Sequence, residues 1–434
     1  MSLSTTFTPS SHKRYPAPDV ARGFMLLLIA LANITFWVQI TTGRAVVSQA
    51  DQIWLFLRTA LIDHRAYPLF SMLLGFGLSV MATNRYNAAR KEASSKLNPL
   101  PEGSGDITLA VQEMAIDEYA TTKAFRLLMR RGWWMLLIGA IHCMFFIGDI
   151  IGTYAAGILI FAILIVKNRQ KTILIIGMVI AAINWILMSA VSYVIKYFPE
   201  IIPKGANDIG GTFDYSPVGI LTRSWMGLVS PLGLIMTPIV LCIALGVYIH
   251  RSGIMENPWL HRTFLLRTAA GGLTLAVAMS IPQGMHVAQY WADPAPWWAY
   301  VVTEIGGVFG ALGWLALLTV WAGPAPEDGE LRGARWFFAM VGRRSMTVYL
   351  GQTVLFIAIF AYINANGAPV PAILQALIAF LVWFVLALGC VALEHAGKRG
   401  PFEWLLRTLV ARSEKPYEFV DPTLPAESHP SSAQ

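Results

Sequence analysis

The stretch DVARGFMLLLIALANI, residues 19–34, decides the fold class, because it is a helix too apolar for the surface of a soluble protein. Three polar residues interrupt it: Asp19 and Arg22 stand near its start, and Asn33 lies well inside the apolar run. A charged side chain inside a membrane helix costs about 2.5–3.5 kcal/mol on insertion scales. Such residues persist where they pair, bind a ligand or face water, so the stretch predicts a membrane helix with a polar entrance.

The composition of the whole chain agrees with this interpretation and excludes an ordinary soluble enzyme. Hydrophobic residues make up 56% of the 434 residues, charged residues 13%, and the mean hydropathy is +0.57. Runs of about 20 apolar residues, rising ~1.5 Å each, cross a hydrocarbon core of ~30 Å. The sequence therefore predicts an all-α polytopic membrane protein with about ten transmembrane helices, at 20–42, 66–84, 132–148, 150–166, 172–194, 228–249, 264–284, 298–321, 336–362 and 370–393.

Lysine and arginine predict the orientation of these helices. If ten helices alternate from a cytoplasmic N-terminus, 26 of the 32 basic residues face the cytoplasm. Cytoplasmic loops of membrane proteins carry such an excess, so we expect both termini in the cytoplasm. The net charge of +7 is then a signal of topology, and the bilayer is the expected partner; we find no nucleic-acid motif.

The organisation along the chain predicts one membrane domain between two tails. Residues 1–18 and 411–434 are expected to be disordered cytoplasmic tails, and residues 19–410 a single transmembrane domain. Within the polar loop 85–131, a flexible centre at 92–106 is expected before a helical stretch. The largest outer loop, about 195–227, is expected to cover an outward-facing cavity. The three cysteines all lie in apolar runs, which is typical of small buried residues.

Six polar residues fall within the apolar layer and are candidates for a functional site. They are Asn33, His142, Asp149, Asn184, Glu304 and Gln352. Each taken alone is better explained by an interhelical hydrogen bond, so the group carries more weight than any member.

The most informative of these residues are His142 and Asp149 in the stretch IGAIHCMFFIGDIIGTYAAGIL, residues 138–159. A spacing of seven residues places both on one helical face, about 10 Å apart along the axis if the helix continues. A carboxylate beside an imidazole fixes its tautomer and favours it as a general base. The structural alternative is that Asp149 caps the following helix and His142 bonds a neighbouring one.

Four stretches together resemble the YeiB-like family, bacterial multipass membrane proteins catalogued as a domain of unknown function. They are DVARGFMLLLIALANI (19–34), HRAYPLFSMLLGFGL (64–78), the stretch from 130 to 159 that contains GDIIGTY, and the C-terminal pair GRRSMTVYLGQT (342–353) and RGPFEWLLRTLV (399–410). The resemblance covers residues 19 to about 410 and implies a multipass protein of the bacterial plasma membrane.

The YeiB-like family resembles, more distantly, a superfamily of transmembrane acyltransferases. In the bacterial enzymes an arginine on the first helix is separated by ten residues from a histidine; here ten residues separate Arg22 from Asn33. The lysosomal member has a similar arginine-to-asparagine pattern, with its histidine placed after this helix. Acyl transfer then needs another histidine, and His142 and His64 are the two candidates, of which we favour His142.

The resemblance also implies a set of site residues. The catalytic candidates are His142, Asp149 and Asn33. The substrate- and donor-binding candidates are Asp19, Arg22, Arg65, Arg130, Arg131, Tyr154, Arg343, Tyr349, Gln352, Glu403 and Arg407. The co-substrate would be acyl-CoA and the acceptor an extracytoplasmic glycan or lipid, with no bound cofactor and no metal, since the histidines are too scattered for a metal site.

Two other functions remain open at this point. Polar residues near the midplane and a glycine-rich helix at 298–321 would also serve a transporter or exporter. The polar residues could instead only hold helices together in a structural or regulatory membrane protein. Acyl transfer predicts that Asn33, His142 and Asp149 converge on a tunnel. The acyl group, the acceptor and the oligomeric state do not follow from the sequence.

Overall fold

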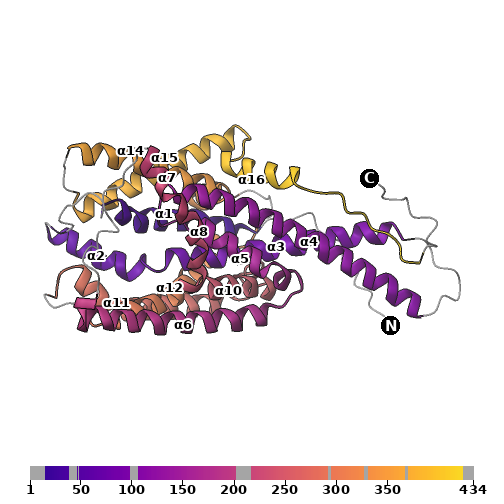
Figure 1. The fold of residues 1–434 in the computed structure, drawn as a ribbon, viewed down its shortest axis with the longest axis horizontal. Helices are drawn as coiled ribbons and strands as arrows, with labels where there is room; N and C mark the ends of the chain where they lie inside the picture. The colour runs from indigo at the N-terminus through magenta and orange to yellow at the C-terminus, as the bar shows by residue number, and fades with distance from the viewer. Residues whose placement is uncertain are drawn as a thin grey trace. The chain divides into compact units, whose positions relative to one another are not determined.

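The computed structural model describes residues 15–38, 46, 48–97, 106–201, 217–291, 295–326, 331–366 and 370–423, and within these ranges it contains helices and no strand. The helices are α1 (Pro16–Val38), α2 (Gln49–Leu61), α3 (Ala66–Ser95), α4 (Asp106–Cys143), α5 (Ile151–Val166), α6 (Gln170–Tyr197), η1 (Pro199–Ile201), α7 (Pro217–Thr222), η3 (Arg223–Trp225), α8 (Met226–Val229), η4 (Ser230–Leu232), α9 (Gly233–Met236), α10 (Ile239–Ser252), α11 (Arg262–Val287), α12 (Ala299–Ala322), α13 (Gly333–Gly342), α14 (Ser345–Asn366), α15 (Ala372–His395) and α16 (Pro401–Arg412) (Figure 1).

The expected all-α polytopic class is confirmed. Among the described residues, eight segments are long and apolar enough to cross a membrane, and α5 and α10 are shorter apolar helices. Each of the ten predicted apolar runs overlaps a helix. The number of crossings and the cytoplasmic placement of both termini remain predictions.

The exposed apolar side chains of α6 support a membrane environment. Ile175, Val179, Ile183 and Leu187, spaced four residues apart, are each more than half exposed. This spacing forms a continuous apolar stripe on one face of the helix. Soluble monomers rarely leave a stripe of this size in water, whereas lipid tails cover it at no cost.

Two of the predicted runs are interrupted in the structure. The run 336–362 is two helices, α13 and α14, which meet at Arg343 and Arg344. The run 228–249 is short turns followed by α10, and the chain is extended at Thr237 between them. Hydropathy averaged over a window of about 19 residues hides both breaks, because the breaking residues lie between segments that are apolar on both sides.

The chain folds as two compact units, which differs from the single domain expected over 19–410. Unit 1 comprises residues 1–69 and 253–400, and unit 2 comprises residues 70–252 and 401–434. The division falls inside α3, where no change in composition marks a boundary. Residues 1–14 and 424–434 of the expected tails, and residues 202–216 of the loop 195–227, lie outside the described residues.

In unit 1, α1 and α13 approach each other at two glycines. A Cβ added to Gly23 would lie 1.9 Å from the backbone oxygen of Phe338, and one added to Gly342 would lie 1.9 Å from that of Asp19. Backbone atoms are in contact here, so only glycine fits, as at close helix crossings in membranes generally. This crossing fixes Asp19 and Arg22 beside the break between α13 and α14.

We expect Gly23→Ala to destabilise unit 1 by separating α1 from α13, lowering the apparent unfolding temperature by several degrees. Unfolding can be followed with a thiol-reactive fluorophore, because the three cysteines are buried. Gly389→Ala in α15 is the matched control, since an added Cβ meets no atom within 4 Å there. Equal unfolding temperatures for the two variants would show that the crossing adapts without cost.

In unit 2, α3 and α4 form a long helical hairpin, and the C-terminal segment lies along it (Figure 1). The predicted flexible centre is shorter than expected, since α3 continues to Ser95 and α4 begins at Asp106; residues 98–105 lie outside the described residues. The expected C-terminal tail begins within α16, and its residues 413–423 pack against the hairpin.

Candidate functional site

The strongest candidate site in unit 2 is the pair formed by His142 and Asp149. Nδ1 of His142 lies 2.7 Å from Oδ1 of Asp149, a hydrogen-bonding distance. The Asp149 side chain is fully buried and that of His142 is 6% exposed. A buried carboxylate at this distance holds one ring nitrogen and orients the imidazole, which directs the other nitrogen, Nε2, away from it.

Local backbone structure positions this pair. Helix α4 ends at Cys143, and the chain turns before α5 begins at Ile151, which brings Asp149 back to the end of α4. The second carboxylate oxygen of Asp149 accepts a hydrogen bond from the backbone N–H of Gly152, 2.8 Å away, and so caps the first turn of α5. The capping role and the pairing with histidine, which the sequence left as alternatives, are therefore both present in one residue.

The pair is enclosed by close packing at small residues. A Cβ added to Gly139 would lie 2.4 Å from the backbone nitrogen of Gly152, and one added to Gly152 would lie 2.4 Å from Oγ of Ser230. Thr153 anchors the same segment by donating a 2.7 Å hydrogen bond to the backbone oxygen of Ser230. The turn that carries Asp149 is thus held between α4 and η4, which limits the movement of its carboxylate.

Tyr154, the tyrosine of the GDIIGTY stretch, is fully buried in unit 2. Its hydroxyl accepts a 3.2 Å hydrogen bond from Oγ of Ser71, and its ring stacks on Phe70 at 5.1 Å between centroids. These contacts connect α5 with α3, which is a structural role.

In unit 1, the predicted donor-binding residues Asp19, Arg22 and Arg343 come together in a network of ion pairs. Arg22 lies 3.3 Å from Asp19, and Arg343 lies 3.8 Å from the other oxygen of the same carboxylate. Arg343 also pairs with Glu394 at the end of α15, at 3.0 Å. The side chains of Arg22 and Arg343 are 24% and 32% exposed, so both are partly accessible to solvent.

Two members of this network were missed by the sequence analysis. Arg344 pairs with Glu394 at 2.8 Å and donates to the backbone oxygen of Lys398 at 2.6 Å. The double arginine in GRRS was a signal that could have included Arg344. Glu394 carried no such signal, because it ends an apolar helix and lies 51 residues from its partner Arg343.

Asn33 and Gln352 also belong to unit 1, whereas His142 and Asp149 belong to unit 2, so the expected convergence of Asn33 with the pair remains a prediction. Nε2 of Gln352 donates a 2.9 Å hydrogen bond to the backbone oxygen of Leu26, which ties α14 to α1. Tyr349, one turn earlier in α14, is 4% exposed. Asn33 is partly buried on α1.

Arg65 is completely buried, and its guanidinium is engaged within the protein. Nη1 donates to the backbone oxygens of Thr59 and Asp63, and Nη2 donates to the backbone oxygen of Ala276 and to Oγ of Ser280. These bonds join the turn between α2 and α3 to α11. The geometry assigns Arg65 a structural role in place of a donor-binding one.

Glu304 in unit 1 is a second buried polar residue with a long-range partner, and it is 3% exposed. The hydroxyl of Tyr67 donates to Oε1 of Glu304 at 3.1 Å, a pairing across 237 residues that the sequence could not indicate. Nearby in the chain, His64 adopts the left-handed conformation with φ of 60°, and its ring meets Tyr300 edge-on at 5.1 Å. No carboxylate contact to His64 comparable to that of His142 is present among the described residues.

The remaining donor-binding candidates lie in unit 2. Arg130 pairs with Glu414 of the C-terminal segment at 3.4 Å, and Arg131 follows it, partly buried. Glu403 and Arg407 belong to α16, where Glu403 is partly buried and Arg407 exposed. The predicted donor-binding residues are thus divided between the two units.

Comparison with known proteins gives one finding. Residues 249–413 match a family model described as protein of unknown function, DUF418. This segment contains Glu304, Arg343 and Gln352 and ends just after α16, whereas His142 and Asp149 lie outside it. No curated protein and no solved structure matches the chain. The match of residues 249–413 to this family model is consistent with the YeiB-like resemblance that the sequence motifs carry.

Proposed function

We propose that the protein is a membrane acyltransferase that moves an acyl group from cytoplasmic acyl-CoA to an extracytoplasmic or lipid-linked acceptor of the cell envelope. The observation that supports this most is the buried pair of His142 and Asp149, joined at 2.7 Å. A carboxylate-oriented imidazole is suited to general-base catalysis, which contributes about 10²–10⁴-fold to a rate. The excess of Lys and Arg on one side of ten alternating helices supports cytoplasmic termini, and the YeiB-like resemblance supports a bacterial plasma membrane location.

In this mechanism Nε2 of His142 takes the proton from a hydroxyl or amine of the acceptor. The acceptor oxygen or nitrogen then forms a bond to the thioester carbonyl carbon, and the carbon–sulfur bond breaks. Asp149 stabilises the imidazolium formed in this step, and the proton passes to the departing thiolate of coenzyme A. Asn33 is the candidate for polarising the carbonyl oxygen.

The donor's phosphates require cationic side chains that remain accessible. In unit 1, Arg22 and Arg343 meet this requirement best, because both are partly exposed and share Asp19. Guanidinium groups bind phosphate through paired hydrogen bonds. Arg65 contributes to the fold alone in this proposal, since its donors are engaged by backbone oxygens and Ser280.

The test is transfer by the purified protein in lipid nanodiscs, with radiolabelled acetyl-CoA and longer acyl-CoAs and an envelope lipid or glycan fraction as acceptor. We expect label in the acceptor with wild type and with His64→Ala, and none with His142→Ala. Loss of label transfer with His64→Ala but not with His142→Ala would identify His64 as the general base. No donor binding and no turnover by folded wild type would reject the proposal.

A transporter is the second candidate, and the buried Glu304 is the observation that favours it. A carboxyl group hydrogen-bonded to Tyr67 within an apolar helix is typical of proton- or cation-coupled pathways. Solute or proton flux in proteoliposomes that is abolished by Glu304→Gln, without acyl transfer, would favour this candidate over the enzyme.

A further inference from the structure

The C-terminal segment, residues 413–423, lies extended along α4 in unit 2. Nε1 of Trp134 donates to Oγ of Ser413 at one end, and Nε2 of Gln112 donates to Oγ1 of Thr423 at the other. Trp134 lies 22 positions after Gln112 in α4, a rise of roughly 33 Å, and Thr423 lies ten positions after Ser413, about the same length for extended chain. The segment therefore runs antiparallel to α4 over this distance, as Figure 1 shows in yellow.

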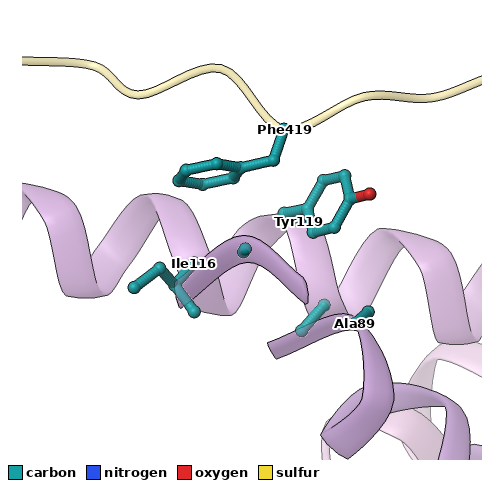
Figure 2. Packing of buried hydrophobic residues seen from close by; sticks show 6 residues of the cluster. Ala89, Ile116, Tyr119 and Phe419 are labelled. Carbon is teal, nitrogen blue, oxygen red and sulfur yellow. The ribbon is translucent and has the colours of Figure 1, made fainter. Parts of the chain in front are cut away.

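Aromatic side chains hold the distal half of this segment. The ring of Tyr417 stacks on Tyr119 at 5.3 Å, and Phe419 meets Tyr119 edge-on at 5.5 Å. Phe419 belongs to one buried cluster with Ile116 and Tyr119 of α4 and Ala89 of α3, which joins the segment to both helices (Figure 2). The hydroxyl of Tyr119 donates to Glu92 at 2.9 Å; burial, with this hydrogen bond, raises the pKa of that hydroxyl and keeps it protonated.

Glu414 and Tyr417 of the same segment also contact basic side chains of α3 and α4. Glu414 pairs with Arg85 of α3 and with Arg130 of α4, and the guanidinium of Arg126 lies 4.1 Å from the ring centre of Tyr417. Arg126 and Arg130 are four residues apart and share one face of α4. A single carboxylate thus occupies a site that two arginines form and a third borders.

This basic site lies next to residues typical of a membrane interface. Trp133 follows Arg130 and Arg131 on α4 and is 60% exposed; Trp404 on α16 is 58% exposed. Leu406 and Val410 bury one face of α16, whereas Trp404 and Arg407 are exposed. Tryptophan and arginine gather where acyl chains meet head groups, so lipid phosphates are the anions nearest to this site.

We propose that Arg85, Arg126 and Arg130 form a binding site for the head group of an anionic phospholipid, and that residues 413–423 are its reversible cover. The carboxylate of Glu414 and a lipid phosphate compete for the same guanidinium groups. Anionic lipid displaces the cover, and the aromatic contacts of Tyr417 and Phe419 return it when the lipid leaves. This proposal is independent of acyl transfer.

The test compares two glutamate substitutions in the same segment of the full-length protein. Glu414→Gln removes the competing charge, whereas Glu418→Gln alters an exposed residue for which no contact is described. Native mass spectrometry of protein titrated with phosphatidylglycerol measures the lipid bound. We expect Glu414→Gln to bind it about fivefold more tightly than wild type, and Glu418→Gln to match wild type.

Three results of this experiment would overturn the proposal. The first is equal binding by the two variants. The second is an equal gain for phosphatidylcholine, which would reflect exposed apolar surface. The third is displacement of phosphatidylglycerol by coenzyme A, which would assign the site to a soluble phosphate ligand. Adding Arg85→Ala and Arg130→Ala to Glu414→Gln is expected to cancel the gain.

A second measurement needs no substitution. We expect hydrogen–deuterium exchange of residues 413–423 to rise in wild-type protein when phosphatidylglycerol replaces part of the phosphatidylcholine in nanodiscs. Exchange of α6 serves as the internal control and is expected to stay constant. A segment that remains equally protected in both lipids would show that it is a fixed part of the hairpin and not a cover.

Discussion

Asp149→Asn is expected to lower the rate of acyl transfer by about 10²–10⁴-fold while leaving the protein folded. Asparagine has the size of aspartate and can still accept the hydrogen bond from the backbone N–H of Gly152, so the cap of α5 is kept. It carries no charge to stabilise an imidazolium. Its amide can also donate to Nδ1 of His142, which stabilises the wrong tautomer for a base at Nε2.

The measurement is the initial rate of label transfer in nanodiscs, at saturating and at limiting acyl-CoA. Because Asp149 acts through His142, we expect kcat to fall while KM for the donor changes little. Asp117→Asn in α4 is the matched control, since it makes the same substitution at an exposed carboxylate whose partner is Tyr86. Full activity of a folded Asp149→Asn variant would leave Asp149 only its capping role.

The pair of His142 and Asp149 could be predicted from the sequence because both residues are local. Seven residues separate them, and the glycine before Asp149 marks the turn that reverses the chain. The direct contact could not be predicted, since a continued helix would have placed the two about 10 Å apart. Because α4 ends at Cys143, the chain turns back before α5 and brings Asp149 into contact with His142.

Contacts between residues far apart in the chain could not be predicted from the sequence. Arg343 was a candidate because it lies in an apolar run, but its partner Glu394 follows 51 residues later. Glu414 meets Arg85 across 329 residues, and the composition of its segment indicated disorder. A short polar segment with isolated aromatic residues carries no periodicity, so only the hairpin that binds it determines its conformation.

Arg65 shows how the same residue type can have opposite roles in a membrane protein. From the sequence it belonged with the donor-binding arginines, since a basic residue at a helix end often serves a ligand. In the structure it is completely buried and bonded to backbone oxygens of three segments and to Ser280. The two roles predict different effects of replacing Arg65. A structural role predicts a loss of stability, whereas a donor-binding role predicts a loss of acyl-CoA binding.

Arg65→Met is expected to destabilise unit 1 by about 3–5 kcal/mol. Methionine fills a similar volume, but the oxygens of Thr59, Asp63 and Ala276 lose a hydrogen-bond donor, and each buried unsatisfied oxygen costs about 1–3 kcal/mol. An added Cβ at Gly310 would lie 2.8 Å from Cγ of Arg65, so the packing leaves little space for rearrangement. We expect the apparent unfolding temperature to fall by roughly 10 °C.

Unfolding in unit 1 can be followed separately in a protein that carries Cys143→Ser and Cys242→Ser, because the remaining Cys390 is buried in that unit. The control is Arg267→Met, which makes the same substitution at an exposed position of α11. Arg65→Lys is expected to fall between wild type and Arg65→Met, since lysine keeps the charge but cannot reach several oxygens with one rigid group. If Arg65→Met unfolds at the wild-type temperature and instead loses acyl-CoA binding, Arg65 is a donor ligand, and the bonds that bury its guanidinium must open when the donor binds.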